Sequence, residues 1–368
     1  MNITIIRDSI LKILQNANLF TSFKINDIKV LRGLLITVKK DGIILNTTNI
    51  NEYYQGEAGG KVEKEGQVLV DFKTFFELVK NLQEVKINME KKQNSLVLSS
   101  SMGKVKLPLL DVSEFLTLKK EVTGIEINKN LFNFSKLRQV VFSSSSDESR
   151  PVLTGICFDF LENETKIVGT DGFRLSLETI KTKSGDTSLD RIIISGKSII
   201  SLAKVFGNKL EKVLYDNSEK QLMFFGEENT VAVRLLEGEF PPYDKVIPKQ
   251  AKTSIVFKRK DLINSLKTAS LFAKEGSNML LVEIVDKNLI ISSSNASTGE
   301  AEFKTPLISK EGENNKITFN YKYLLDFLNI IEEKEITFEM TNSFAPGVFK
   351  KSSNNDYLHI IMPIRSQE

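Results

Sequence analysis

The sequence predicts an α+β protein made of three homologous domains, because two different strand–helix patterns each occur three times along its 368 residues. The first pattern opens with a short apolar strand, continues with apolar residues at helical spacing, and closes on a Phe seventeen positions after its start. Its copies are residues 3–20, 125–142 and 255–272. The copies of the second pattern align without a gap and hold Lys at the sixth position; they are residues 68–82, 192–206 and 317–331.

The spacing of the copies sets the size of the repeated domain. Successive copies lie between 122 and 130 residues apart, which is the length of one ordinary domain. Each strand–helix pattern is followed by alternating apolar and polar runs that are typical of strands. We therefore expect each domain to be a doubled β-α-β-β-β unit. The predicted domains are residues 1–121, 122–246 and 247–368.

In the first domain the strands after the first helix are easy to place. Residues 30–38 and 42–48 alternate like antiparallel strands, and residues 39–42 form the hairpin turn between them. Residues 85–110 repeat strand and turn after the second helix. The sequence Val-Thr-Gly at 122–124 opens the second domain.

The second and third domains follow the same plan. Residues 152–160 and 165–180 occupy the places of the strands in the first domain, and residues 213–240 supply the later strands. Residues 241–252 hold three prolines within eight positions, so they cannot be a central strand and are expected to be a linker. The third domain ends on a terminal apolar strand at residues 357–365.

Composition excludes several classes of protein. The hydrophobic content of 41% suffices for several cores, and the chain lacks the Pro, Gly and Ser bias of disordered segments. No apolar run reaches the roughly 20 residues of a membrane span, and Arg7 with Asp8 interrupts the place of a signal peptide. We expect a folded cytoplasmic protein without membrane contact.

The scarcity of reactive side chains argues against an enzyme. The chain has one Cys, one His and no Trp, which excludes an internal disulfide and a cysteine metal cluster and leaves few routes to a nucleophile triad. We expect His359 to be a structural strand residue and Cys157 a small buried residue. No Gly-rich phosphate loop is present. The sequence therefore predicts no catalytic residue, no metal and no cofactor.

The six predicted helices concentrate positive charge. They hold 15 Lys or Arg and 5 Asp or Glu, a net charge of +10, whereas the whole chain has +3. A charged helix is usually only a solvated face, but here the excess recurs on equivalent helices of repeated domains. A shared surface of this kind, without aromatic side chains between the cations, favours sequence-independent contact with a phosphate backbone. The helix windows are residues 7–20, 71–82, 128–142, 195–209, 258–272 and 320–331.

Four sequence segments add to the threefold repeat. They are SSSSDESRPVLTGICFDF at 143–160, GTDGFRLS at 169–176, EGEFPPYDKVIP at 237–248 and YLHIIMPIR at 357–365. In this order and spacing they make the whole chain resemble the DNA polymerase III beta subunit family, the bacterial sliding clamps. The resemblance implies the DNA-clamp fold, in which two chains pair head to tail into a ring with helices lining the hole and strands forming the outer wall. It also implies a role in tethering a polymerase to duplex DNA, without a reaction of its own.

The resemblance further implies partners and a peptide pocket. The implied partners are double-stranded DNA bound without regard to sequence, a second copy of the chain, the DNA polymerase III catalytic subunit, the clamp loader complex, and other DNA polymerases and repair proteins that carry a short apolar peptide motif. The pocket of the family lies between its second and third domains. The matching positions here are Arg150, Leu153, Thr170, Gly172, Phe173, Arg174, Leu175, Pro241, Lys245, Val246, Phe344, Pro346, Ile360, Ile361, Met362, Pro363, Ile364 and Arg365.

Two further sets of residues are expected at surfaces. The DNA-facing set is Lys12, Lys24, Lys73, Lys80, Lys136, Arg138, Lys197, Lys204, Lys209, Arg259, Lys260 and Lys267. The dimer-interface set is Lys73, Lys104, Lys106, Leu107, Leu271, Phe272, Glu300 and Glu302. The two-residue period of a strand places the two lysines 104 and 106 on one face and the two glutamates on one face of another strand. Opposite charges there would favour head-to-tail pairing, at about 0.2–1 kcal/mol for each exposed pair.

Two features depart from the family, and two other functions compete with it. Clamps are usually acidic, whereas this chain has a net charge of +3, and position 173 holds Phe where His is frequent, which makes the pocket wall more apolar. One competitor is a metal-assisted hydrolase that uses Asp171, Arg174 and the pair Asp147 and Glu148, but these carboxylates lack metal-ligand spacing. The other is a monomeric protein-binding repeat scaffold that does not encircle DNA. A molar mass measured in solution would separate the scaffold from the ring.

Overall fold

The structure is a computed structural model of the chain, and it describes residues 1–21, 29–101, 103–116, 124–182, 189, 191–273, 278–295 and 299–365. Its elements follow the predicted order, because a strand, a helix and three further strands occur six times in succession, with one additional short strand, β5, in the first copy. This order confirms the doubled β-α-β-β-β unit. The chain divides into two compact units, which we call unit 1 (residues 1–130 and 197–235) and unit 2 (residues 131–196 and 236–368). The predicted second domain therefore contributes residues to both units.

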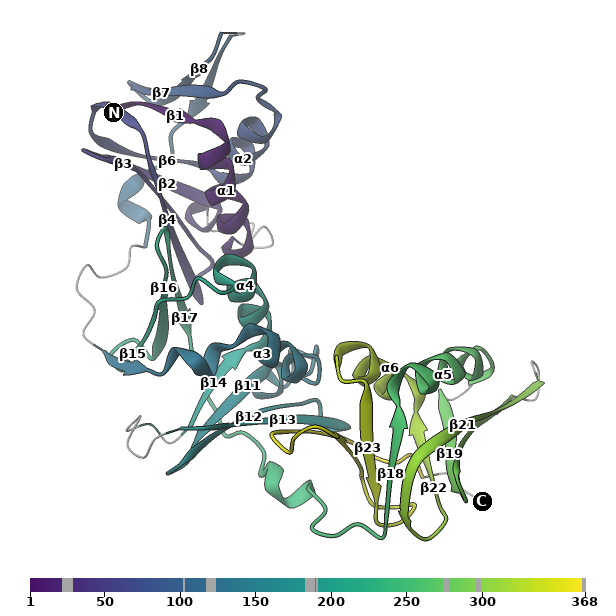
Figure 1. The fold of residues 1–368 in the computed structure, drawn as a ribbon. Coiled ribbons are helices and arrows are strands. Elements are labelled where there is room, and N and C mark those ends of the chain that lie inside the picture. The colour runs from purple at the N-terminus through teal and green to yellow at the C-terminus, as the bar shows by residue number, and fades with distance from the viewer. Residues whose placement is uncertain are drawn as a thin grey trace. The chain divides into compact units, whose positions relative to one another are not determined.

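Unit 1 contains two antiparallel sheets (Figure 1). Their strand orders are β5-β1-β7-β8-β9 and β10-β15-β16-β17-β4-β3-β2-β6. The strands are β1 (Asn2–Ile6), β2 (Gly33–Lys39), β3 (Gly42–Thr48), β4 (Glu52–Gly59), β5 (Lys61–Lys64), β6 (Gly66–Asp71), β7 (Lys86–Lys92), β8 (Ser95–Ser99), β9 (Lys104–Pro108), β10 (Ile125–Ile127), β15 (Lys212–Asp216), β16 (Gln221–Phe225) and β17 (Asn229–Arg234). Strand β17 pairs with β4, with Asn229 opposite Gly56, so segments of two predicted domains share one sheet.

The helices of unit 1 bury the apolar faces that their sequences predict. They are α1 (Arg7–Ala17), α2 (Phe72–Asn81) and α4 (Gly196–Phe206). Helices α1 and α2 lie side by side, as Figure 1 shows. Helix α2 starts at Phe72 because the Asp71 carboxylate accepts a hydrogen bond from the Thr74 N–H at 2.8 Å and so caps the first turn.

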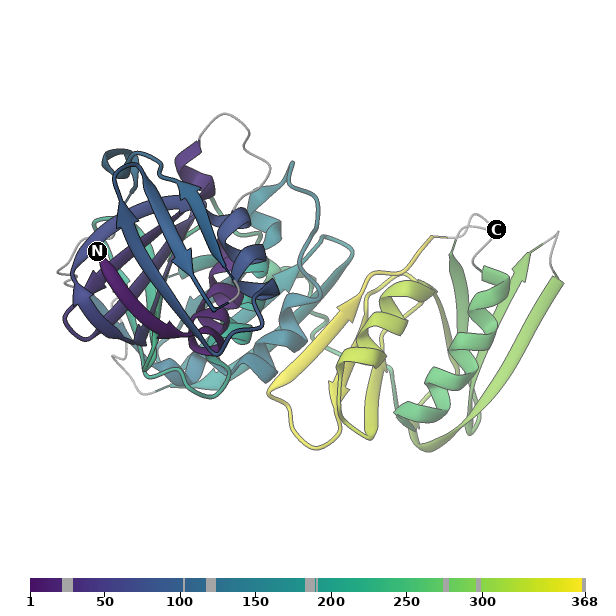
Figure 2. The same cartoon turned by 90° about the horizontal axis from the view of Figure 1, so that it is seen from above.

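Unit 2 contains one sheet of twelve strands in the order β14-β11-β12-β13-β25-β24-β23-β18-β21-β20-β19-β22. The strands are β11 (Gly155–Phe160), β12 (Glu164–Thr170), β13 (Arg174–Lys181), β14 (Arg191–Ser195), β18 (Thr253–Lys258), β19 (Met279–Val285), β20 (Asn288–Asn295), β21 (Gly299–Gly312), β22 (Asn315–Asn320), β23 (Glu335–Met340), β24 (Gly347–Lys351) and β25 (Tyr357–Ile361). Its helices are α3 (Phe134–Val141), α5 (Arg259–Ala273) and α6 (Tyr321–Ile330), of which α5 and α6 lie side by side in Figure 2. The pairing of β13 with β25 joins a strand of the second repeat to the last strand of the third repeat.

Short 3-10 turns account for the main differences from the predicted elements. They are η1 (Asn18–Phe20), η2 (Lys29–Arg32), η3 (Val112–Glu114), η4 (Lys129–Phe132), η5 (Pro151–Thr154) and η6 (Tyr243–Val246). The predicted helix at residues 128–142 was wrong in its first turn, since α3 begins only at Phe134. The Asn133 side chain accepts a hydrogen bond from the Lys136 N–H at 3.2 Å, so Asn133 caps the helix and ends the 3-10 turn before it.

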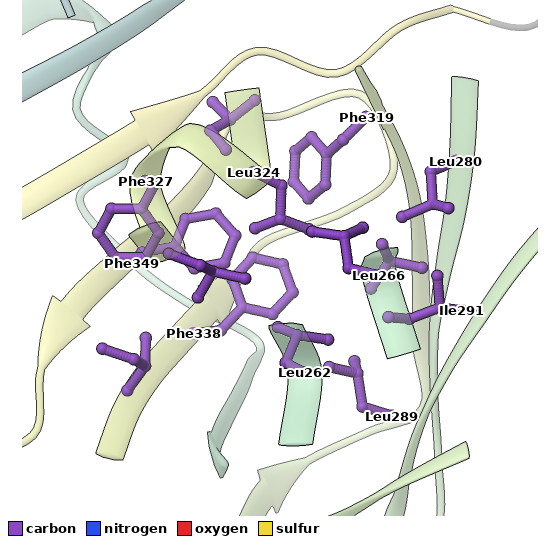
Figure 3. Close-up of a cluster of buried hydrophobic side chains, with 14 of the residues drawn as sticks. Leu262, Leu266, Leu280, Leu289, Ile291, Phe319, Leu324, Phe327, Phe338 and Phe349 are labelled. Carbon is purple, nitrogen blue, oxygen red and sulfur yellow. The ribbon is translucent and has the colours of Figure 1, made fainter. Parts of the chain in front are cut away.

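The core of the third repeat is aromatic on the side of α6. Figure 3 shows leucines of α5 and α6 pointing toward a group of phenylalanine rings from β22, β23, β24 and α6. The rings of Phe338 and Phe349 stack at 4.5 Å between centroids, and Phe327 lies 5.2 Å from Phe349. Burying each such side chain contributes about 1.5–3 kcal/mol to folding, so this cluster fixes α6 on the sheet.

An arginine at the start of one helix caps the end of its neighbour in two of the three repeats. Arg7 Nη2 donates to the Lys80 carbonyl at 2.7 Å and Arg7 Nε donates to the Val79 carbonyl at 3.2 Å. In the equivalent position of the third repeat, Arg259 Nη1 donates to the Leu328 carbonyl at 2.7 Å. The last carbonyls of a helix lack intrahelical partners and carry partial negative charge, so a guanidinium stabilises them.

Replacing Arg259 with Met is expected to destabilise unit 2 by about 1.5 kcal/mol, the value of a hydrogen bond to a charged group. Urea unfolding would measure the change. The matched control is Lys260→Met, since Lys260 is exposed and has no ion pair with another described residue. Both variants lose one positive charge, so equal unfolding midpoints would contradict the capping role of Arg259.

Candidate functional site

A tight turn at residues 171–173 joins β12 to β13. The Asp171 carboxylate accepts hydrogen bonds from the backbone N–H groups of Phe173 and Arg174, each at 2.9 Å. Gly172 has a φ of +92°, a conformation that is strained for residues with a side chain. The turn is thereby fixed, and it holds the Phe173 ring at the surface with 57% of its area exposed.

The ladder between β13 and β25 continues this turn. Leu175 lies opposite Ile360, and beyond the end of β25 the Met362 N–H donates to the Phe173 carbonyl at 2.9 Å. Because side chains alternate along a strand, the two strands present one apolar face and one polar face. These faces contact different parts of unit 2.

The apolar face forms a buried floor. Leu175 and Leu177 of β13 and Ile360 of β25 belong to one buried cluster. Its other members are Cys157, Val168, Ile193, Phe240, Tyr243 and Val348. Cys157 has no exposed area, and burial raises the pKa of its thiol to about 12. The prediction of a small buried cysteine is confirmed.

The linker is anchored to this floor through Tyr243. The Tyr243 hydroxyl donates to Asp159 Oδ2 at 2.6 Å, and Arg191 Nη2 lies 2.6 Å from the same oxygen. Residues 241–252, all of which the structure describes, contain η6 and no strand, as predicted for a linker. The anchored turn leaves Pro241, Lys245 and Val246 exposed at the surface.

The residues before β11 approach the turn from a second direction. A Cβ added to Gly172 would lie 3.8 Å from Arg150 Nη1, so the Arg150 guanidinium stands beside the turn. The Arg150 side chain is 51% exposed, and its Nε lies 3.6 Å from Asp147. Thr170 is buried, and its hydroxyl donates to the Arg174 carbonyl at 2.7 Å. From η5, Val152 packs against the floor, and the predicted pocket residue Leu153 is buried.

Two predicted pocket residues have other places than expected. Ile361 lies in the core of the third repeat, because alternation along β25 turns it away from Ile360. Arg174 is only 12% exposed in its side chain, so most of it is enclosed by neighbouring residues. Its guanidinium is bound to Asp171 and Asp326.

Phe344, Ile364 and Arg365 line a separate cavity of about 920 Å³. They share it with three residues of the predicted dimer-interface set, namely Phe272, Glu300 and Glu302. The Asn342 side chain accepts hydrogen bonds from the N–H groups of Phe344 and Ala345, and this turn leaves Phe344 70% exposed. Pro346 lines a smaller cavity and Pro363 is partly buried beyond β25, so the place of these residues in a peptide pocket stays a prediction.

Tyr323 is a site residue that the sequence did not reveal. Its ring stacks on the Phe173 ring at 6.4 Å between centroids, and it lies 4.8 Å from the guanidinium carbon of Arg174. Helical spacing places Tyr323 one turn from the buried Phe327, which marks it as a partly buried residue and says nothing of its partner. The pairing of β13 with β25 brings the turn at residues 171–173 to the third repeat, to which α6 and Tyr323 belong.

The polar face of the ladder contains a buried hydrogen-bond network. Ser176 Oγ lies 2.8 Å from His359 Nδ1 and 2.7 Å from Ser143 Oγ. The Tyr357 hydroxyl donates to the Gln139 carbonyl at 2.9 Å. His359 has no exposed area and stacks on Phe327 at 4.7 Å, so the prediction of a structural strand residue is confirmed.

The stability of the protein is expected to fall as the pH is lowered from 7.5 to 5. Burial, together with the nearby Arg174 cation, holds the pKa of His359 well below its ordinary value of 6.5. The unfolded chain therefore binds a proton near pH 6.5 that the folded chain does not, so stability decreases below that pH by up to about 1.4 kcal/mol per pH unit. His359→Gln keeps a polar group and cannot titrate. Urea midpoints that depend on pH equally in both proteins would contradict the assignment.

The predicted DNA-facing residues differ in whether a polar partner is bound to them. Four have polar partners: Lys12 lies 2.7 Å from Glu228, Lys80 lies 3.8 Å from Glu77, Lys136 lies 2.5 Å from Glu178, and Arg259 caps α6. The exposed residues without an ion pair to another described residue are Lys73, Arg138, Lys204, Lys209, Lys260 and Lys267. Lys197 is exposed as well, and Lys24 lies outside the described residues.

The predicted dimer-interface residues lie on two sheet edges. Among the described strands β9 pairs only with β8, and the part of β21 before residue 307 pairs only with β20. The charged residues Lys104, Lys106, Glu300 and Glu302 are exposed, as is Leu271 at 65%. Leu107 is 7% exposed, because side chains alternate along β9 and Leu107 points to the buried side while Lys106 points to solvent. Lys73 is exposed on α2.

The competing hydrolase would need a metal site and a free carboxylate. The described residues contain no group of three His, Cys, Asp or Glu side chains that could hold a metal ion. The Asp171 carboxylate of the competing hydrolase is occupied by the turn and by Arg174. No helix within the described ranges is long and apolar enough to cross a membrane.

Nearly the whole chain matches the domain models of one protein family. Residues 1–119, 126–242 and 244–365 match the N-terminal, central and C-terminal domains of the DNA polymerase III beta subunit. The beta sliding clamp of Bacillus subtilis is 28% identical over 380 residues and covers 100% of both chains, and that of Halalkalibacterium halodurans is 28% identical over 355 residues, covering 92% of this chain and 93% of its own.

Solved structures agree with these matches. The DNA polymerase sliding clamp from Bacillus subtilis has a TM-score of 0.92 at 26% identity, with 100% of both chains covered. The beta subunit from Thermotoga maritima has a TM-score of 0.89 at 26% identity and the same coverage. Since three consecutive domain matches and full-length structural similarity agree, the chain belongs to the DNA polymerase III beta subunit family, the bacterial sliding clamps.

Proposed function

We propose that this chain is a non-catalytic processivity factor, a DNA sliding clamp that acts in the cytoplasm. Two copies would pair head to tail into a ring around double-stranded DNA and tether the DNA polymerase III catalytic subunit to it. The clamp loader complex, other DNA polymerases and repair proteins would bind the same ring through short apolar peptide segments. The three predicted domains, 1–121, 122–246 and 247–368, would each contribute two helices to the inner surface of the ring.

The observation that carries the proposal is the pair of unpaired sheet edges with opposite charge. Strand β9 presents Lys104 and Lys106, and the start of β21 presents Glu300 and Glu302. An exposed strand edge is a template for pairing with another chain, and natural proteins usually protect such edges. One edge of each kind per chain fits a head-to-tail contact, which closes into a ring when the rotation is right.

The proposed peptide site lies over the apolar floor of Leu175, Leu177 and Ile360, and the exposed Phe173 and Val246 are its expected border. Its apolar side chains, together with the flexible thioether of Met362, suit partners of varied sequence. Burial of a Leu or Phe anchor contributes about 1.5–3 kcal/mol, so two anchors suggest micromolar affinity after the cost of ordering the peptide. Such affinity allows partners to exchange on one ring.

Light scattering at micromolar concentration is expected to give twice the chain mass of 41.5 kDa. A mass of one chain would favour the monomeric protein-binding scaffold, the alternative function. Reversing Lys104 and Lys106 to Glu is expected to weaken the dimer, because like charges then face each other across the edge. Reversing Glu300 and Glu302 to Lys in the same chain should restore it.

The control for this charge reversal lies on the opposite edge of the same sheet. Lys61 and Lys64 of β5 are exposed, and β5 pairs only with β1 among the described strands. Reversing these two lysines changes the net charge equally and should leave the dimer unchanged. A quadruple variant at residues 104, 106, 300 and 302 no more dimeric than the double variant would show that the two edges do not meet.

A further inference from the structure

Arg174 is enclosed by four side chains from three separate segments. Its Nε lies 3.1 Å from Asp171 Oδ2 within its own turn, and its Nη1 lies 2.7 Å from Asp326 Oδ2 on α6. The guanidinium carbon is 5.3 Å from the centroid of the Phe142 ring and 4.8 Å from that of Tyr323. Two carboxylates and two aromatic rings therefore contact this one guanidinium.

The same contacts form a continuous column that ends at the surface. Phe142 follows α3, Arg174 begins β13, and Tyr323 lies in the first turn of α6. The Tyr323 ring stacks on the Phe173 ring with an interplanar angle of 16°, and Phe173 is 57% exposed. The Tyr323 ring therefore contacts both the Arg174 guanidinium and the exposed Phe173 ring.

Only arginine suits this central place. Its guanidinium is planar and presents several donors, so it can lie between two rings and still reach two carboxylates. Lysine has a compact ammonium that pairs with a carboxylate but does not stack. A planar group at this position determines how the Tyr323 ring is inclined, and hence how the Phe173 ring meets a ligand.

We propose that Arg174 is a positioning residue, which orients the Phe173 and Tyr323 rings as an aromatic wall that selects partner peptides with an aromatic anchor over those with an aliphatic one. The inference rests on the proposed function, in which the site binds short peptides. An aromatic pair in an offset or edge arrangement gains affinity beyond the area buried, about three- to tenfold, and this gain requires a fixed ring orientation. A leucine anchor gains burial alone, so its binding depends less on Arg174.

The test measures two affinities for each variant. Two short fluorescein-labelled peptides, identical except for Phe or Leu at the last anchor, are titrated with the full-length dimer, and anisotropy gives the ratio of their dissociation constants. The wild-type protein is expected to favour the Phe peptide about three- to tenfold. Arg174→Lys keeps the positive charge and should reduce this ratio to near one. Tyr323→Leu should do the same, and the double variant should show no further loss, since both act on one wall.

Arg234→Lys is the matched control, because Arg234 is an exposed arginine of β17 that lies outside the predicted pocket. This control should leave the Phe to Leu ratio unchanged. An undiminished ratio in a folded Arg174→Lys variant, with equal loss of both peptides, would overturn the positioning role and leave a purely structural one. If the wild-type protein bound neither peptide, the proposed function would fail instead. If melting curves show that Arg174→Lys is misfolded, Asp326→Asn decides instead, because it removes a carboxylate partner of Arg174 and should also lower the ratio.

Discussion

Once loaded on a nicked circular plasmid, this protein is expected to stay with the DNA through gel filtration and to leave within minutes after the plasmid is cut at one site. A ring is retained by topological linkage and needs no tight contact. Contacts between lysines and phosphates, by comparison, weaken by about 10³-fold or more when salt rises from about 50 to about 200 mM, for six to ten contacts. Filtration at the higher salt therefore separates the two modes of binding.

The charge-reversed variant with Glu at positions 104 and 106 provides the control, because it alters the proposed seam and none of the helices. It should be lost from the circular plasmid as rapidly as from the linear one, and the compensating reversal at positions 300 and 302 should restore retention. Equal retention of the wild-type protein on both DNA forms would contradict the topological mechanism and favour a protein held by charge alone.

In the proposed ring, the helix cations would set how freely it slides. Lys73, Arg138 and Lys204 are exposed and have no ion pair with another described residue, whereas Lys12 and Lys136 already have carboxylate partners. Unpaired lysines contact phosphates without reading bases, so they attract DNA without fixing a register. Pairing of some cations reduces the effective charge below the +10 counted on the helix windows.

Local patterns predicted most of the elements, and they did so for physical reasons. Apolar spacing and capping residues act within a few positions, which is why the helices at α2 and α6 match their expected windows. The late start of α3 depends on a single cap at Asn133. The apolar spacing of the predicted window fits a longer helix equally well, so it could not reveal this start. The pairings β17 with β4 and β13 with β25 are set by contacts between distant segments, so no periodicity within one segment could predict them.

The site residues were predicted through family resemblance and stay a prediction, whereas their contacts are known only from the fold. Alternation along β13 and β25 could have placed Leu175 with Leu177 and separated Ile360 from Ile361. The enclosure of Arg174 could not be predicted, because its partners Tyr323 and Asp326 lie on a helix far away in the sequence. Asp326 is 152 positions from Arg174. Charge alone suggested a rim cation.

Glu178→Gln is expected to lower the free energy of unfolding by about 3–5 kcal/mol, the cost of removing one partner from a buried ion pair. The Glu178 side chain is 1% exposed, with Lys136 Nζ 2.5 Å from Oε1 and Lys351 Nζ 3.9 Å from Oε2. Lys136 is 38% exposed and can turn to solvent, but Lys351 is 12% exposed and lies 4.9 Å from the Tyr357 ring. The variant therefore leaves the Lys351 cation enclosed without a carboxylate.

A matched control tests burial rather than charge. Glu339→Gln breaks an ion pair of similar length, in which Lys350 Nζ lies 2.8 Å from Glu339 Oε2. The Lys350 side chain is 30% exposed and that of Glu339 is 25% exposed, so the expected loss is about 0.2–1 kcal/mol. Adding Lys351→Met to Glu178→Gln should recover much of the loss, because no buried charge then lacks a partner. Urea unfolding measures all three variants. Equal losses for Glu178→Gln and Glu339→Gln would show that the Glu178 pair behaves as a surface pair, and Lys136 would then be free to contact DNA as its helix position predicts.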